Sequence, residues 1–224
     1  MSSVSFKIER FADPFLSTVF IILSGGFQDA YTYMCRGKVF ANAQTGNIVL
    51  LSDKIFRGDF RAGLKYLVPV ISFLLGTVAA EIIRYNAKKL KLIHFRQAVL
   101  VFETAVLFSV GFVPGEYDIF ANAAVSFVCA LQLQSFPTLR GQAFASTMCV
   151  GNMKNAAVYL SSYIKNKDKK HLEISALYFA VVTLFGLGAA LGSFAAEKFG
   201  LKSIFGSCIL LIISFIIFAE RKEA

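Results

Sequence analysis

Long apolar runs dominate the chain, and its charged residues gather between them. Six runs are candidates for membrane spans: 15–35, 66–84, 97–113, 119–139, 174–196 and 203–219. Each is close to the roughly 20 apolar residues that an α-helix needs to cross about 30 Å of hydrocarbon. The pattern predicts an all-α polytopic membrane protein with about six transmembrane helices.

A polar motif interrupts this pattern in each half of the chain, and its positions follow the same order both times. The aligned positions are Gln28 with Gln132, Arg36-Gly37 with Arg140-Gly141, Phe40-Ala41 with Phe144-Ala145, Gly46-Asn47 with Gly151-Asn152, and Gly76 to Glu81 with Gly192 to Glu197. We interpret the chain as two copies of one unit. The first copy covers residues 15–96 and is completed by the span 97–113. The second covers residues 119–224, and residues 1–14 form a polar cytoplasmic leader.

Each copy also contains a segment that is apolar enough to enter a membrane but carries polar residues in its middle. The first, Val39 to Leu51, would extend only about 20 Å as a helix, which is too short for a full crossing. The second, Ala143 to Ser162, is longer but holds Lys154 and two asparagines. Polar backbone at membrane depth is tolerated where it is buried in protein or lines a cavity. We therefore predict that both segments, called the GN elements after their shared Gly-Asn pair, are broken or re-entrant helices.

Basic residues mark the cytoplasmic side of a membrane protein. The loop 84–96 carries five Lys and Arg residues and no acid, whereas the turn 114–118 carries two acids and no base. If the second GN element returns to the side it left, the basic loop 165–170 and the C-terminal tail also lie in the cytoplasm. Each unit then has three spans, which inverts the second unit relative to the first. The prediction is a 3+3 inverted repeat with both termini in the cytoplasm.

The composition agrees with a membrane protein and excludes an ordinary soluble domain. Hydrophobic residues make up 56% of the 224 positions, far above their usual share, and Phe alone accounts for 24. The net charge of +9 would suit a nucleic-acid-binding protein, but the positive residues lie beside the apolar runs. That placement favours contact with a lipid bilayer and its anionic headgroups. We predict no nucleic-acid partner.

Motifs for catalysis, metal binding and cofactor binding are absent from the sequence. The four cysteines, Cys35, Cys129, Cys149 and Cys208, are scattered through apolar segments without a C-x-x-C pair, and we expect buried, inert thiols. No GxSxG, HExxH, P-loop or dinucleotide fingerprint is found. We therefore expect no enzyme activity, no metal and no cofactor, and any active transport would draw on an ion gradient.

The residues around the first GN element carry a family signature. Asp29-Ala30 is followed, at Gly37 to Asn47, by the run G-K-V-F-A-N-A-Q-T-G-N. Through this signature, and in length and span pattern over essentially the whole chain, the protein resembles the YoaK family of small bacterial membrane proteins, a domain of unknown function. The resemblance implies a bacterial inner-membrane protein of about six spans. It implies no activity.

Asp29 is the strongest candidate for a functional group. An ionised carboxylate inside the hydrocarbon costs several kcal/mol, so it must be paired, hydrated or protonated, and such residues mark ion and proton paths. The alternative is a structural ion pair between Asp29 and Arg36 or Arg140. Glu103, within another apolar run, is a second buried acid.

The GN elements supply neutral donors and acceptors that suit a polar solute or an ion. The candidates are Asn42, Gln44, Thr45, Gly46 and Asn47 in the first element and Gly151, Asn152 and Asn155 in the second. Broken helices also expose backbone N–H and C=O groups that bind ions. Gln28 and Gln132, present in both copies, either line the same cavity or bridge helices. The alternative for the whole set is that these side chains only satisfy the broken backbone.

These residues together favour a small secondary transporter or channel for a small polar or ionic solute. Its site is expected at the repeat interface near the membrane midplane, with Asp29 as the coupling carboxylate. Arg36 and Arg140 either bind an anionic solute or anchor the chain at the membrane interface. The alternative function is a non-transporting membrane protein that binds a lipid or a protein partner. Either function is compatible with a monomer or a homo-oligomer.

Overall fold

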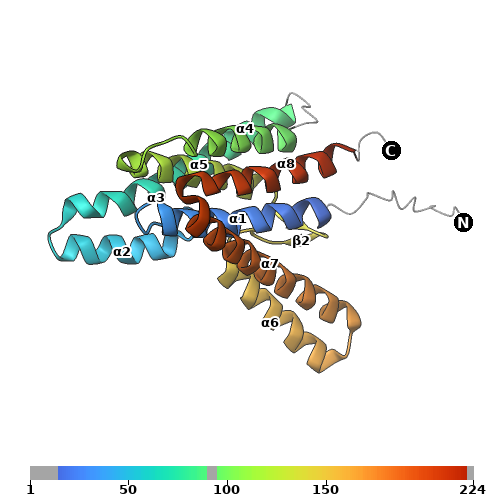
Figure 1. Ribbon diagram of the computed structural model, residues 1–224. Helices are drawn as coiled ribbons and strands as arrows, with labels where there is room; N and C mark the ends of the chain where they lie inside the picture. The colour runs from blue at the N-terminus through green and yellow to red at the C-terminus, as the bar shows by residue number, and fades with distance from the viewer. Residues whose placement is uncertain (1–14, 90–94, 221–224) are drawn as a thin grey trace, which may run out of the picture.

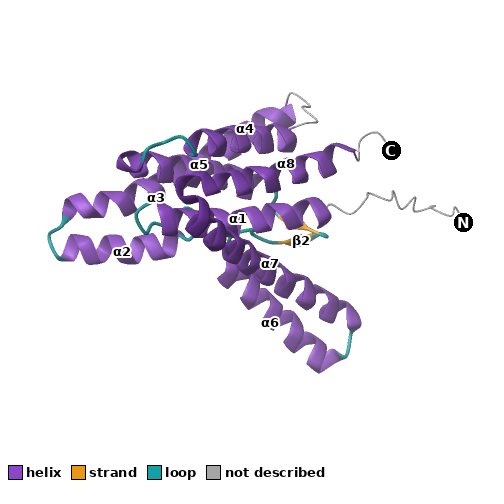
Figure 2. Ribbon diagram, viewed as in Figure 1, coloured by secondary structure: helices purple, strands orange, loops and turns teal. Residues whose placement is uncertain are grey.

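The computed structural model describes residues 15–89 and 95–220, and these fold into α-helices with one small β-hairpin (Figures 1 and 2). The helices are α1 (Phe15–Cys35), α2 (Gln44–Phe56), α3 (Phe60–Lys89), α4 (Phe95–Val110), α5 (Asp118–Ser135), α6 (Cys149–Asn166), α7 (Lys169–Phe199) and α8 (Phe205–Glu220), and short 3₁₀ turns cover Gly115–Tyr117 and Gly200–Ile204. The hairpin pairs β1 (Thr138–Leu139) with β2 (Gln142–Ala143). The predicted all-α class is confirmed, with this hairpin as an addition.

The predicted apolar runs are mostly helical, but the run 97–113 extends beyond the end of α4 at Val110, and the run 119–139 leaves α5 after Ser135 and ends in β1. α1 has the same bounds as the first run, whereas α3 extends the second run in both directions and continues through Pro69. Backbone hydrogen bonding carries a helix into charged flanks that a search for apolar residues leaves out. The predictions for the leader 1–14, for part of the loop 84–96 and for residues 221–224 fall outside the described residues.

The helices of the two halves pack against each other. α1 lies along α7, and α3 lies along α5. α2 turns back onto α3 and α6 turns back onto α7, so two helical hairpins project in different directions in Figure 1. α4 and α8 lie side by side, and they also contact α5 and α1, respectively. The largest apolar core lies among α1, α4, α5 and α8, where Tyr31, Leu100, Val125 and Leu211 are fully buried.

Glycines bring the backbones of crossing helices into contact. A Cβ atom at Gly26 of α1 would collide with the carbonyl group of Phe185 in α7, and one at Gly188 would collide with that of Leu23. The crossing of α3 and α5 is similar, since a Cβ atom at Gly76 would collide with a carbonyl group of α5. Such close approach strengthens van der Waals packing, which is a main attraction between helices in lipid.

Much of the outer surface is apolar. On α3, the side chains of Leu74, Val78 and Ile82 are each more than half exposed. Two helical stretches, Phe60–Asn86 and Lys169–Ala219, are long and apolar enough to cross a membrane. Exposed apolar surface of this kind marks an interaction with a membrane or a partner. Together these features indicate that the protein associates with a membrane.

Candidate functional site

After α1 the chain turns and runs back alongside that helix. Residues 36–43, here called the first return segment, are held by hydrogen bonds to α1. The backbone N–H of Ala41 donates to Thr32 Oγ1 at 3.1 Å, and the side-chain amide of Asn42 donates to the carbonyl of Gly25 at 3.0 Å. The first return segment therefore brings the start of α2 to the middle of α1.

The second return segment, residues 136–148, follows α5 and reaches the same part of α1. A Cβ atom at Gly25 would lie 2.7 Å from the methyl carbon of Thr147. The Thr147 hydroxyl also lies near the thiol of Cys129 in the body of α5. Within the second GN element, Ala143 to Ser162, the structure has the last residue of β2, an irregular stretch over residues 144–148, and then α6 from Cys149 onward.

The repeated Arg-Gly pairs lie at turns with left-handed backbone. Gly37 has a φ of +79° and Gly141 a φ of +78°, and the neighbouring Lys38 and Arg140 also have positive φ. Glycine adopts this conformation without the steric cost that a Cβ atom imposes. Backbone geometry thus accounts for the glycine of each repeated pair.

Asn47 and Asn152 have the same structural role in the two copies. The side-chain amide of Asn47 donates to the carbonyl of Phe40 at 2.6 Å, and that of Asn152 donates to the carbonyl of Ala145 at 2.7 Å. Both asparagines are buried. Each therefore holds the bend that precedes its own helix, α2 or α6, which is the structural alternative considered from the sequence.

The other candidates of the GN elements differ in their surroundings. Gln44 donates to a backbone carbonyl of the first return segment at 2.6 Å and accepts a hydrogen bond from the side chain of Asn47 at 2.9 Å. Thr45 and Gly151 are exposed, and Asn155 is half-buried. Gly46, half-buried, packs against the Phe40 ring. These residues mainly shape the ends of the two return segments.

The two return segments meet at a buried polar region that we call the junction, formed by Gly25, Asp29, Asn42, Ser146 and Thr147. Among the described residues, Asn42 Oδ1 and Ser146 Oγ have no hydrogen-bond partner, and Thr147 Oγ1 has only the nearby thiol. Such atoms are rare, because leaving a buried polar group unpaired costs about 1–3 kcal/mol. A hydrogen-bonding partner supplied to these atoms would remove that cost.

Asp29 is bound by the backbone of the first return segment. Its Oδ1 accepts a hydrogen bond from the N–H of Asn42 at 2.7 Å, and the amides of Ala41 and Ala43 also face the carboxyl group. These amides directly precede α2, so the carboxyl group lies at the positive end of that helix dipole. These amides favour the anionic form of Asp29 and offset part of the cost of burying its charge, without a basic side chain.

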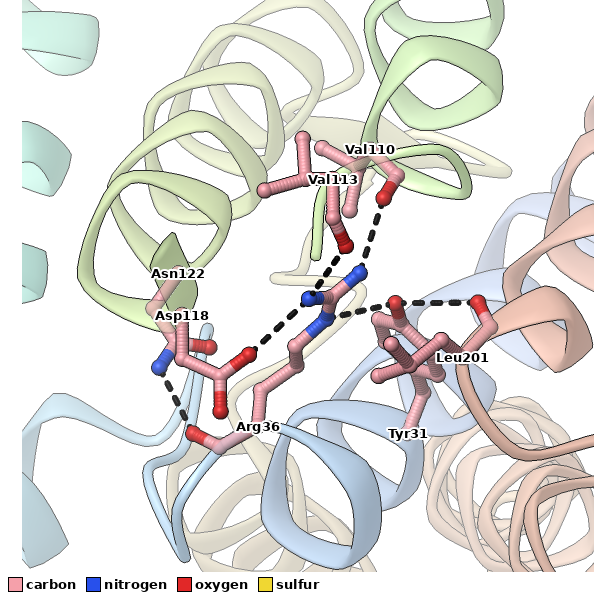
Figure 3. Close-up of polar contacts among 7 residues, drawn as sticks. All are labelled: Tyr31, Arg36, Val110, Val113, Asp118, Asn122 and Leu201. Atoms are coloured by element: carbon pink, nitrogen blue, oxygen red, sulfur yellow. Dashed lines mark hydrogen bonds and ion pairs between the residues drawn. The ribbon is translucent and has the colours of Figure 1, made fainter. Parts of the chain in front are cut away.

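Arg36 is fully buried at the end of α1, and Figure 3 shows its guanidinium surrounded by oxygen atoms. It donates to the Tyr31 hydroxyl at 2.7 Å and to the carbonyls of Val110 at 2.8 Å and Val113 at 2.9 Å. It also forms an ion pair of 2.9 Å with Asp118. Arg36 therefore does not form the ion pair with Asp29 that the sequence left open as an alternative.

Arg140 lies near the opposite end of α1. Its guanidinium carbon is 4.7 Å from the ring centroid of Phe15. Asp29 follows Phe15 by 14 positions, which corresponds to about 21 Å along a helix, so Arg140 cannot pair with it. Arg140 and Arg96 instead line a cavity of about 130 Å³ together with hydroxyl groups such as that of Thr138.

Glu103 is fully buried on α4 and is shared by the repeated glutamines. Its Oε1 accepts from the side-chain amide of Gln28 at 3.0 Å and from that of Gln132 at 2.9 Å, and its Oε2 accepts from Gln132 at 2.8 Å. The two glutamines thus join α1 and α5 to the same carboxyl group of α4. The glutamines therefore bridge helices, which is one of the two roles considered for them from the sequence.

Two pairs of buried serines connect α1 with α8, and they were not among the residues expected from the sequence. The hydroxyls of Ser24 and Ser207 lie 2.7 Å apart, and those of Ser17 and Ser214 lie 2.8 Å apart. Gln28 also donates to Ser24 at 3.0 Å. In α1 and in α8 the two serines are seven positions apart, which places them on one helix face. That spacing is the signal by which the sequence could have identified them.

Apolar grooves lie on the outside of the fold, and no metal centre is found within residues 15–89 and 95–220. A groove of about 360 Å³ between α4 and α8 includes Leu100, Phe108, Ile212 and Phe215 in its lining. A second, of about 390 Å³, lies between α4 and α5.

In the described part of the chain, no three His, Cys, Asp or Glu side chains are grouped to hold a metal ion.

Comparison with known proteins gives a family match and no further relatives. A family model described as "Protein of unknown function (DUF1275)" matches residues 17–217. This match agrees with the resemblance to the YoaK family. No curated protein and no solved structure matches the chain.

Proposed function

We propose that this chain, which belongs to the DUF1275 family of unknown function, is a small membrane transporter or channel for a small polar or ionic solute. One observation carries the proposal: two return segments from different halves of the chain meet at the junction, where Asn42 Oδ1 and Ser146 Oγ have no hydrogen-bond partner among the described residues. Irregular backbone that meets inside a helical membrane protein is typical of solute and ion sites in transporters.

In this proposal six helices cross the membrane: α1, α3, α4, α5, α7 and α8. α2 and α6 begin beside the junction and lead outward, so each enters the membrane part-way. Their apolar outer faces support this, since Ile48 and Val49 of α2 and Val150 and Val158 of α6 are at least half exposed. The basic loops favour an orientation in a bacterial inner membrane in which both termini face the cytoplasm.

The helix contacts support an inverted repeat. α1 contacts α7 as α5 contacts α3, α2 contacts α3 as α6 contacts α7, and α1 contacts α8 as α5 contacts α4. Exchanging the two halves therefore leaves the contact pattern unchanged. In Figure 1, α1 and α5 also run in opposite directions. The glycine contacts favour Gly188 as the counterpart of Gly76, one helical turn before the Gly192 that the sequence alignment paired with it.

A second candidate function is the binding of a lipid by a protein that transports nothing. The groove of about 360 Å³ between α4 and α8 favours it, because its lining is apolar and it would open toward the acyl chains. In this case the polar atoms of the junction would bind only structural water.

Flux measurements in proteoliposomes test the transport proposal. Urea and glycerol serve as neutral probes followed by light scattering, and K⁺ and Cl⁻ serve as ionic probes. At least one probe should cross faster than in protein-free vesicles. Thr147→Val removes a junction hydroxyl without changing shape and should reduce that flux about fivefold, the equivalent of a hydrogen bond of about 1 kcal/mol.

Thr45→Val is the matched control, because Thr45 is exposed at the start of α2 and should leave the flux unchanged. No flux above background for any of the four probes would count against transport and favour the lipid-binding alternative. Equal flux in both variants would mean that the solute path does not pass the junction.

A further inference from the structure

Glu103 differs from Asp29 in the groups that hold it. Asp29 faces backbone amides at the start of a helix, where the helix dipole favours a negative charge. Glu103 is completely buried, and among the described residues its hydrogen bonds come only from the neutral side-chain amides of Gln28 and Gln132. None of the ion pairs found among the described residues includes it.

The side-chain amide of Gln28 does not satisfy all of its neighbours at once. Gln28 Nε2 carries two hydrogens but lies within hydrogen-bond distance of three acceptors: Ser24 Oγ at 3.0 Å, Glu103 Oε1 at 3.0 Å and Ser207 Oγ at 3.3 Å. Gln28 Oε1, in the same amide group, has no partner among the described residues. A proton bound to the carboxyl group would add one donor to this network.

The neighbouring titratable groups do not supply a compensating positive charge. On the packed helices, the thiols of Cys129 on α5 and Cys208 on α8 interact electrostatically with Glu103, and neither carries a positive charge. Cys129 also interacts with Asp29 of α1, so both acids lie near the same part of α5. On α4 itself Arg96 is seven positions away, about 10 Å along the helix axis. An ionised carboxylate at this position costs several kcal/mol, and binding a proton removes that cost.

We infer that Glu103 is a proton-binding site shared by the two halves, and that a proton exchanging there with the aqueous phase is the coupling ion. The carboxylate takes up the proton at one of its oxygens, and the repeated glutamines adjust their hydrogen bonds to the neutral acid. The coupling role rests on the proposed transport function, whereas proton binding itself does not. The role expected for Asp29 from the sequence is thereby assigned to Glu103.

Infrared spectroscopy of the purified protein in lipid nanodiscs tests proton binding directly. A protonated carboxylic acid has a carbonyl band that the carboxylate lacks. Titration of the wild type should reveal such a band appearing as pH falls, and Glu103→Gln should lose it. Asp29→Asn is the control variant and should keep it. A spectrum that is the same in wild type and Glu103→Gln at every pH, or a Glu103 band that never changes with pH, would overturn the assignment.

Proton flux in vesicles, followed with a pH-sensitive dye enclosed inside, separates this inference from the proposed function. If Glu103 titrates but neither a probe nor a proton crosses the vesicle membrane, Glu103 is a proton-binding site. The transport function and the coupling role are then both wrong. If a probe crosses and the Glu103→Gln spectrum matches the wild type, transport stands and the proton site falls. If both proposals hold, Glu103→Gln abolishes proton flux while its thermal stability equals that of the wild type.

Discussion

The guanidinium of Arg36 lies 2.9 Å from the carboxylate of Asp118, and the arginine side chain is completely buried. The two residues tie the end of α1 to the start of α5. Asn122 strengthens this connection, because its side-chain amide donates to the backbone carbonyl of Arg36 at 2.8 Å. The first and second halves of the chain are therefore joined by a charged contact on the side of the fold that holds the acidic turn.

The buried ion pair predicts a large effect on stability. Asp118→Asn leaves the buried guanidinium without its counter-charge and should destabilise the fold by up to about 3–5 kcal/mol, less any part that solvent at the aspartate offsets. Adding Arg36→Met to Asp118→Asn should restore part of the loss. Thermal unfolding in detergent measures both. Arg84→Met is the control, because its pair with Glu81 is exposed and should contribute less than about 1 kcal/mol; an equal loss there would contradict the special role of Arg36.

Asp29 is predicted to act as an anchor for the first return segment. Asp29→Asn keeps an acceptor oxygen for the N–H of Asn42 and should fold with little loss of stability. Asp29→Leu removes it and should cost about 1–3 kcal/mol, the penalty for unpaired buried amides. Unfolding temperatures distinguish the two variants. Loss of probe flux in a stable Asp29→Asn protein would show instead that the Asp29 charge takes part in coupling.

Two glycines of α7 offer a matched test of helix packing. Gly188→Ala would push a Cβ atom into the carbonyl of Leu23 and should destabilise the protein by roughly 1–3 kcal/mol through overpacking. Gly186→Ala meets nothing within 4 Å and should stabilise the helix by about 0.5–1 kcal/mol. Thermal unfolding of both variants is the measurement. A similar response of the two variants would mean that α1 and α7 are not in close contact.

Labelling from outside the cell tests the proposed topology. In a variant lacking the native cysteines, Glu116→Cys should react with a membrane-impermeant maleimide in intact cells. Lys167→Cys should react only after the membrane is opened, because the proposal puts the α6–α7 connection in the cytoplasm. Labelling of Lys167→Cys in intact cells would mean that α6 crosses the whole membrane, and the inverted repeat would fall.

The sequence alone determined the elements that depend on local pattern. α1 has the same bounds as its apolar run, because a predominantly apolar stretch of about 20 residues has one favourable state in a membrane, a helix. The repeated motif also paired Asn47 with Asn152, and the structure shows both side chains donating a hydrogen bond to a carbonyl seven residues earlier. Such contacts lie within one bend of the chain, so the local residues specify them.

Only the tertiary structure decided which polar groups meet. Arg36 had Asp29 near it in the sequence, yet its partner is Asp118, and the repeated glutamines both bind Glu103. These partners depend on the rotation and crossing of whole helices. Backbone contacts at glycines such as Gly26 and Gly188 set these crossings. The packing energy of each crossing is a sum over many residues of both helices. The pattern of apolar and polar residues along the chain does not contain these interhelical contacts. The helices could therefore be predicted individually, whereas the contacts between them could not.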